Sequence, residues 1–199
     1  MVVVQKRVFE VDGVLSERVL VLSRAWERPA AADGRPLEEW IVPVDDVKQY
    51  IWALAAELHI AAIQFDPAFI TWEAGKLAAA GLAMREFPQH MVRMGAASQS
   101  LYELVLSRVV CHDGDPVLAR HVANAVAKQQ RSGSASWRLE KGAAKRKMDA
   151  CIALAMAIWS LQHPGDEPKA PKKGPNSYGL DDEELDELLG VEEAGTTRV

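Results

Sequence analysis

The segment that most constrains the fold is DACIALAMAIWSLQ, residues 149–162, which carries no charge after its first residue. A helix that is apolar on every side has to lie inside a core, because none of its faces can rest against water. Asp149 opens this segment, directly after the basic run KRKM. Burying an unpaired carboxylate is costly, so the sequence predicts that a helix N-terminus, a cation or a metal compensates the charge of Asp149.

The composition is that of one sizeable core with a tail. The chain has 199 residues, 49% hydrophobic and 26% charged, and we expect one domain over residues 1–164, followed by a Pro/Lys-rich linker and a disordered acidic tail over residues 165–199. No apolar run is long enough to cross a bilayer and no signal peptide is evident, which predicts a soluble, cytoplasmic protein with no membrane partner. The two cysteines, Cys111 and Cys151, provide neither a disulfide framework nor a zinc quartet, and we expect both to be buried hydrophobes.

The net charge of −5 is unevenly distributed. Ten of the 28 acidic residues follow Gly165, against four basic residues, so the rest of the chain is close to neutral. A basic segment precedes Asp149, with Glu140 as its one acid, and comprises Lys128, Arg131, Arg138, Lys141, Lys145, Arg146 and Lys147. Such a segment is either a solvated surface or a contact for a nucleic-acid backbone, and taken alone the pattern favours the solvated surface.

Hydrophobic periodicity predicts a mixed α/β sheet with helices packed on it. Residues 2–11 and 18–27 form a hairpin around Asp12-Gly13. The remaining predicted elements are a helix at 47–58, a buried strand in IAAIQFDP at 60–67, a helix at 71–82, a strand at 83–89, helices around 96–108 and 116–130, a loop or loose hairpin in the basic segment, and the helix at 149–162.

Asp66 lies at the exit of the buried strand. Ligands of α/β sheets bind beyond the carboxyl ends of parallel strands, so Asp66 and Asp149 face each other if the last helix begins near that edge. Two close carboxylates must share a proton or a cation, and carboxylate oxygens suit Mg²⁺ or Mn²⁺. The simpler interpretations are that Asp149 is a plain N-cap and Asp66-Pro67 a plain turn, and each is favoured when taken singly.

Three ordered segments resemble the nuclease domain of tailed-phage terminase large subunits: IQFDPAFITWEAGKLAAAGLAMREFPQ, MVRMGAASQSLYELVLSRVVCHDGDPVLARHVANAV and KRKMDACIALAMAI. The resemblance covers about residues 2–162. It implies an RNase H-like mixed sheet flanked by helices, with acidic residues that hold two divalent metals, Mg²⁺ or Mn²⁺, and cut concatemeric double-stranded DNA during packaging. Asp66 matches the acid of the family's central strand and Asp149 the acid that opens the last helix, so both are implied as catalytic, metal-binding residues.

The chain also departs from that family. The family's first metal-binding aspartate lies on a strand before the one that VVVQKR matches, and this sequence begins with VVVQKR; it also contains no GxxxxGK[ST] phosphate loop. We therefore expect the first strand, its acid and the ATPase domain to be absent, as in a split gene product, a fragment or a remnant. His112 and His121 are left out of the site, because a lone histidine is more often structural than a ligand.

Two hypotheses follow. The chain is a metal-dependent endonuclease that is active only when another polypeptide supplies the first strand and its acid, or it is a non-catalytic DNA-binding remnant. In both, Lys141, Lys145 and Arg146 contact the DNA backbone. Its partners are then double-stranded DNA and a terminase ATPase segment, the small terminase subunit or the portal, in the host cytoplasm, and a free sheet edge also allows self-association.

Overall fold

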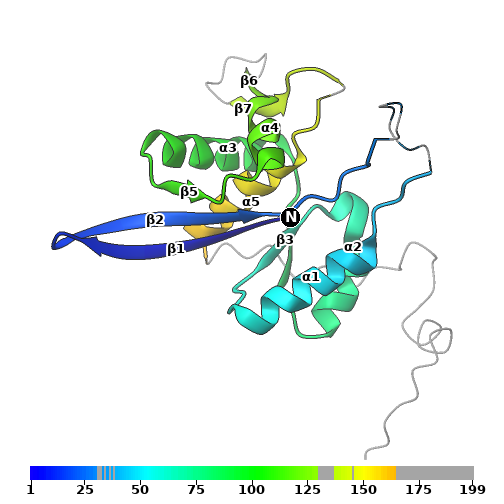
Figure 1. Cartoon of the computed structure of the whole chain (residues 1–199), viewed down its shortest axis with the longest axis horizontal. Coiled ribbons are helices and arrows are strands. Elements are labelled where there is room, and N and C mark those ends of the chain that lie inside the picture. Colours follow the sequence, from blue (N-terminus) through cyan, green and yellow to red (C-terminus); the bar gives the residue numbers. More distant parts are fainter. Residues whose placement is uncertain are drawn as a thin grey trace, which may run out of the picture.

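The structure is a computed structural model that describes residues 1–30, 33, 35, 37, 39–129, 137–144 and 146–164 (Figure 1). The predicted tail at 165–199 lies outside the described residues, as does Lys145. Among the helices that the structure describes, none has the length and apolar character needed to cross a bilayer.

The N-terminal hairpin is confirmed, but its second strand begins and ends four residues earlier than predicted. Strands β1 (Val2–Val11) and β2 (Val14–Ser23) pair antiparallel along their whole length. Asp12 and Gly13 both have positive φ, +53° and +77°, as a two-residue type I′ turn requires. The other edge of β2 pairs parallel with β5 (Val110–His112), which gives the strand order β1-β2-β5.

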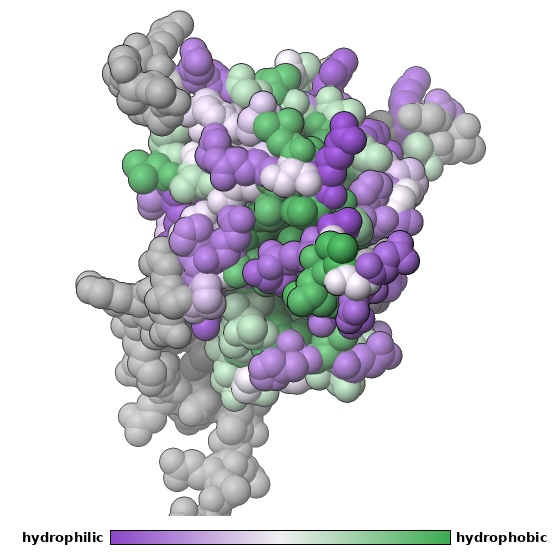
Figure 2. Space-filling model, turned by 90° about the vertical axis from the view of Figure 1, so that its left-hand side faces the viewer, coloured by the Kyte–Doolittle hydropathy of each residue, from purple (hydrophilic) through white to green (hydrophobic). Residues whose placement is uncertain are grey.

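The tip of this hairpin extends beyond the helices in Figure 1. Figure 2 views the molecule from that side and shows apolar side chains between hydrophilic ones. Four apolar residues near the turn are exposed, namely Val8, Phe9, Val14 and Leu15. The hairpin is therefore paired along its backbone but leaves part of its apolar surface in water.

The parallel part of the predicted sheet forms a separate small sheet. Strand β3 (Ile63–Phe65) pairs parallel with β4 (Met84–Glu86). Helix α1 (Val44–Glu57) precedes β3, and α2 (Pro67–Ala79) connects β3 to β4 and packs against β4. The predicted mixture of antiparallel and parallel pairing is present within the β1-β2-β5 sheet, and in the described residues β3 and β4 form a separate parallel pair.

The expected helix over 116–130 is wrong in its second half. Helix α4 (Pro116–Ala123) ends at Asn124, and residues Ala125–Gln129 form β6, which pairs antiparallel with β7 (Trp137–Lys141). The Ser98 hydroxyl on α3 (Met91–Leu106) accepts the Leu139 N–H and attaches β7 to the core. Long-range pairing therefore overrides the helical periodicity that the local sequence suggests.

Helix α5 (Asp149–Gln162) has the predicted bounds and lies in the core. It packs against α3, α4, β1 and β3. Ile158 and Ala155 are fully buried, and the Trp159 ring meets Phe87 edge to face, with ring centroids 5.5 Å apart. Cys151 is also buried on α5, as predicted, and burial raises the pKa of its thiol to about 11. The expectation for Cys111 is wrong, because this residue is exposed on β5.

Two glycine substitutions should change stability in opposite directions. Gly13→Ala places a side chain at φ +77°, in the left-handed region, and should destabilise the protein by about 1–2 kcal/mol. Gly75→Ala lies inside α2, where an added Cβ meets no atom within 4 Å, and should stabilise it by about 0.5–1 kcal/mol. Urea unfolding midpoints measure both. A Gly13→Ala variant as stable as the parent would contradict the turn described above.

Candidate functional site

One cleft contains both predicted acids. It has a volume of about 1380 Å³ and is bounded by residues of β1, α1, β3, α2, β7 and α5. Most of its walls are apolar, and its charged lining residues are Lys6, Lys48, Asp66, Glu73, Arg85, Arg138, Glu140, Lys141 and Asp149. Residues at the end of β3 and at the start of α5 thus line the same cleft. The closer arrangement that the sequence predicts, with the two carboxylates facing each other, stays a prediction.

Asp66 has a structural role in addition to any chemical one. It is half-buried and is the N-cap of α2, where its Oδ1 accepts the Ala68 N–H at 3.0 Å. The helix begins with Pro67, four residues earlier than the sequence predicted, because this cap and the proline at the first helical position define its start. A carboxylate offers about four lone-pair sites, so one capping bond leaves Asp66 able to bind a further group.

Asp149 is not the N-cap of its helix. Met148 occupies that position and makes no side-chain capping bond, while Asp149 is the first residue of α5. Asp149 is exposed to the cleft, and within the described ranges its carboxylate accepts no hydrogen bond and joins no ion pair. The cost of burying the charge therefore does not arise. The first turn of a helix is also a favourable place for an anion.

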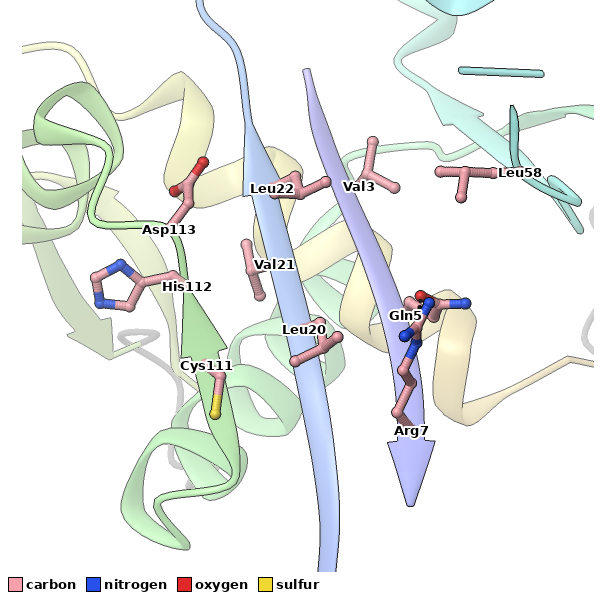
Figure 3. A pocket seen from close by; sticks show the side chains of 10 residues that line it. All are labelled: Val3, Gln5, Arg7, Leu20, Val21, Leu22, Leu58, Cys111, His112 and Asp113. Carbon is pink, nitrogen blue, oxygen red and sulfur yellow. Dashed lines mark hydrogen bonds between the residues drawn. The ribbon is translucent and has the colours of Figure 1, made fainter. Parts of the chain in front are cut away.

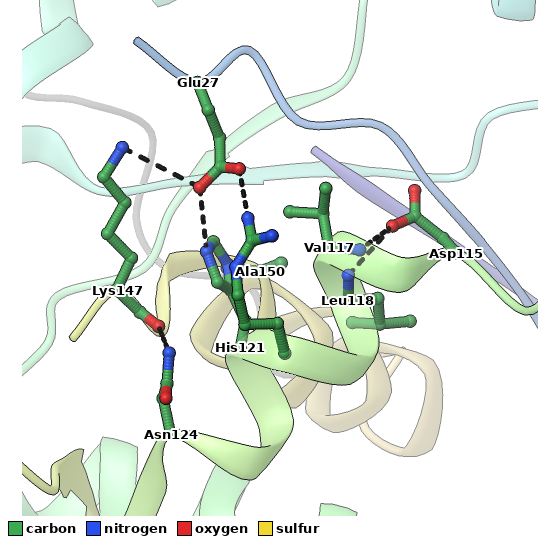
Figure 4. A network of polar contacts seen from close by, with 9 residues as sticks. Glu27, Asp115, Val117, Leu118, His121, Asn124, Lys147 and Ala150 are labelled. Atoms are coloured by element: carbon green, nitrogen blue, oxygen red, sulfur yellow. Dashed lines mark hydrogen bonds and ion pairs between the residues drawn. The ribbon is translucent and has the colours of Figure 1, made fainter. Parts of the chain in front are cut away.

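The N-terminus of α5 is held by residues from α4 (Figure 4). His121 Nδ1 accepts the Ala150 N–H at 3.0 Å, and its Nε2 lies 3.2 Å from Glu27 Oε1. Asn124 Nδ2 donates to the Lys147 carbonyl at 2.9 Å. We call these five residues the α4–α5 clamp. The sequence does not predict this clamp, because His121 and Ala150 are 29 positions apart and no local pattern connects them.

Glu27 lies close to two cationic side chains at the edge of the α4–α5 clamp. Its carboxylate pairs with the Arg120 guanidinium and lies 3.7 Å from Lys147 Nζ. Partial burial acts to raise the pKa of Glu27, but the hydrogen bond and charge of Arg120, together with Lys147 and His121, outweigh it and lower that pKa below its ordinary value. The basic segment therefore has a second compensating acid, which is distant in sequence.

The basic segment is partly neutralised. Lys128 and Arg138 each reach Glu140 at 2.7 Å, and these partners lower the pKa of Glu140. Lys141 and Arg146 are exposed and form no ion pair with any described residue. Arg131 and Lys145 lie outside the described residues. Two of the three predicted DNA contacts can therefore be located, and both present uncompensated charge.

A smaller pocket lies over the three-stranded sheet (Figure 3). It has a volume of about 360 Å³ and is lined from β1, β2 and β5, with Leu58 and Asp113 at its margin. Neither predicted acid lines it, and Asp113 is its one carboxylate. The cleft, rather than this pocket, has the chemistry of the predicted site.

The carboxylate oxygens of the cleft are suitable ligands for a divalent cation, but few of them are uncommitted. Glu73 lies 3.6 Å from Lys48 Nζ, and Glu140 is paired as described above, so Asp66 and Asp149 are the acids least engaged by cations. Where the structure describes the chain, it brings together no group of three Asp, Glu, His or Cys side chains that could hold a metal. Mg²⁺ is commonly bound through one or two carboxylates, with water and substrate phosphates as its other ligands.

Comparisons with known proteins agree with the resemblance noted in the sequence. The family model for the endonuclease domain of the terminase large subunit matches residues 29–164. The crystal structure of the HK97 bacteriophage large terminase is similar in fold, with a TM-score of 0.54 and 23% sequence identity. The similarity covers 80% of this chain and 36% of that one, so the chain spans about a third of the length of that terminase. No curated protein matches the sequence.

Removing the charge of Glu27 should make the free energy of unfolding depend less on pH in the acidic range. Because the folded-state pKa lies below the ordinary value of 4.5, this carboxylate stabilises the fold above that pH, and the contribution is lost as the pH falls through the lowered pKa. Glu27→Gln should therefore cost about 1–3 kcal/mol at pH 7, and the cost should be smaller at pH 3 than at pH 7 because the contribution declines as the pH falls below 4.5. Urea unfolding across this range measures the difference.

Glu17→Gln is the matched control, because Glu17 forms an exposed ion pair with Lys6 on the hairpin. Such pairs contribute little, so this variant should remain within about 0.5 kcal/mol of the parent at both pH values. A destabilisation by Glu27→Gln of the same size at pH 7 and pH 3 would show that the charge of Glu27 is not its cause.

Proposed function

The chain belongs to the endonuclease-domain family of terminase large subunits, and on this premise we propose that it is a metal-dependent nuclease domain that cuts concatemeric double-stranded DNA for phage packaging in the host cytoplasm. The observation that supports the proposal is that Asp66 and Asp149 both line one cleft. They are 83 positions apart in the sequence, at the exit of β3 and the start of α5.

Asp66 and Asp149 are the proposed metal ligands and catalytic residues, with Mg²⁺ or Mn²⁺ as the cofactor. When bound, two such ions activate water and stabilise the leaving oxygen of a scissile phosphate. The chain's own contribution is to hold the two carboxylates. Asp66 is fixed by its capping bond to Ala68, and Asp149 projects from the first turn of a buried helix with its oxygens uncommitted.

The proposed DNA contacts are Lys141 and Arg146, together with Lys145, which lies outside the described residues. Lys141 lines the cleft, and Arg146 lies three residues before Asp149. Contacts from such residues to phosphates position the duplex without reading its sequence and weaken as salt rises. The uncompensated charge of Lys141 and Arg146 supports this role, whereas Glu140 already neutralises Lys128 and Arg138.

A further carboxylate completes the proposed site from outside the described residues. β1 pairs with β2, and β3 with β4, so in the described part of the chain one edge of β1 and one edge of β3 have no partner strand. Residues of both strands line the cleft. We propose that an aspartate-bearing strand, from a terminase ATPase segment or from a separate polypeptide, pairs at these edges and brings the third acid.

The alternative is a non-catalytic DNA-binding member of the family. The small number of ligands in the cleft favours it, because two aspartates alone hold a pair of metals poorly. Other proposed partners in either case are the small terminase subunit and the portal. Self-association through the exposed apolar hairpin or a free strand edge is also part of this proposal.

Mn²⁺ binding tests the two aspartates directly. Asp66→Asn and Asp149→Asn should each weaken Mn²⁺ binding by about tenfold or more, because each removes a negative ligand from a site that has few. Asp46→Asn, an exposed acid in the first turn of α1 outside the cleft, is the control and should leave affinity unchanged. Calorimetric titration measures all three. Equal affinity in the parent and both site variants would exclude this metal site.

Plasmid nicking in Mn²⁺ tests the requirement for a third acid. The chain alone should cut at a rate about 10²–10⁴ below that of the same protein supplied with an aspartate-bearing strand, since a positioned catalytic group contributes on that order. An identical strand with asparagine in place of aspartate is the control and should give no rescue. Duplex binding should persist throughout, because Lys141 and Arg146 do not depend on metal. Robust cleavage by the chain alone, abolished by Asp149→Asn, would show that two acids suffice.

A further inference from the structure

The N-terminus of α5 lacks a cap of its own. The first N–H groups of a helix have no partner within the helix, and a polar N-cap side chain usually accepts one of them. Met148 occupies the N-cap position here and has no side chain that can do so. Met148 and Ala150 are both buried, so water cannot take the place of that acceptor.

His121 supplies the acceptor from another helix. It is 3% exposed, and its Nδ1 receives the Ala150 N–H at 3.0 Å. Because Nδ1 accepts, the proton of the neutral imidazole is on Nε2, which faces Glu27 Oε1 at 3.2 Å. Glu27 thus fixes both the ring orientation and the tautomer that capping requires. Arg120 and Lys147 hold Glu27 in its turn.

A second bond anchors the chain on the other side of Asp149. Asn124 Nδ2 donates to the Lys147 carbonyl, and the Asn124 carbonyl accepts the Gly142 N–H at 3.0 Å. Positions 147 and 150 are therefore both tied to the end of α4, as Figure 4 shows. Asp149 lies between these two anchors, and its carboxylate takes part in neither.

We propose that His121 is a positioning residue for Asp149. By capping α5 from outside, it fixes the backbone that carries Asp149 and relieves the aspartate of the capping role that residues of its type usually have at helix starts. Both oxygens of Asp149 then remain available to the cleft. The part of this inference that concerns a metal rests on the proposed function, whereas the part that concerns the backbone does not.

NMR of the full chain tests the backbone part without metal. The ¹⁵N shifts of His121 should show protonated Nε2 and bare Nδ1. His121→Leu should accelerate amide exchange of Ala150 by about tenfold or more relative to Leu154 in the same helix, and lower the backbone order parameter of Asp149. His121→Asn should preserve both, because its side-chain oxygen can stand near the Nδ1 position and accept the same N–H.

Mn²⁺ affinity tests the functional part. His121→Leu should weaken binding by about 10- to 100-fold, as loss of groups that orient metal ligands commonly does, and His121→Asn should remain within about threefold of the parent. Ile158→Val, a change at a fully buried position of α5, is the control for lost stability alone. It should lower the unfolding midpoint without changing Mn²⁺ affinity.

Each outcome decides one of the two parts. A protonated Nδ1, or an unchanged Ala150 amide and Asp149 order parameter in His121→Leu, overturns the positioning role. Equal losses of Mn²⁺ affinity in His121→Leu, His121→Asn and Ile158→Val reduce His121 to a stabilising residue and overturn it as well. No Mn²⁺ binding by the parent chain overturns the proposed function, while the NMR measurements still decide whether His121 holds Asp149.

Discussion

The structure depends first on the burial of one helix that has no polar face. Helix α5 packs against β1, β3, α3 and α4, and its remaining face lines the cleft. Its ends are the only places where its backbone needs polar partners, and its first residue is the only charged one. The N-terminus of α5 is therefore where the apolar core, the basic segment and the cleft that Asp66 and Asp149 line come together. A site at this point obtains a rigid base from the same packing that stabilises the fold.

Local signals predicted the elements that depend on local interactions. The Asp12-Gly13 turn, the bounds of α5 and the position of Asp66 at a strand exit were all evident, because turn geometry, periodicity and the Asp-Pro pair act over a few residues. The β6 strand was missed because its partner, β7, begins eight residues after β6 ends, so the pairing is not a local signal. The capping of Ala150 by His121 was missed for the same reason. Both are long-range interactions that only the folded chain brings together.

The four carboxylates that line the cleft differ in the partners that they contact, and this difference decides which of them are free to bind a cation. Four acids line it, but Glu73 and Glu140 are each close to a lysine, whereas Asp66 gives one oxygen to a backbone N–H and Asp149 gives none. A carboxylate already paired with a cation has less attraction left for a metal. The sequence could name Asp66 and Asp149 by resemblance, but only the contacts explain why the two glutamates beside them are poorer ligands.

On the proposed function, stability and activity are linked through the cleft. β3 and β4 have three residues each, and a two-stranded sheet of that size is not stable alone, so it depends on the helices and on α5. The apolar walls between β1 and β3 leave hydrophobic surface open to water. A strand that paired at both edges would bury that surface and join the two sheets, while its aspartate joined Asp66 and Asp149. The binding energy that completes the sheet would then also assemble the acids, so that cleavage depends on an ordered, fully paired fold.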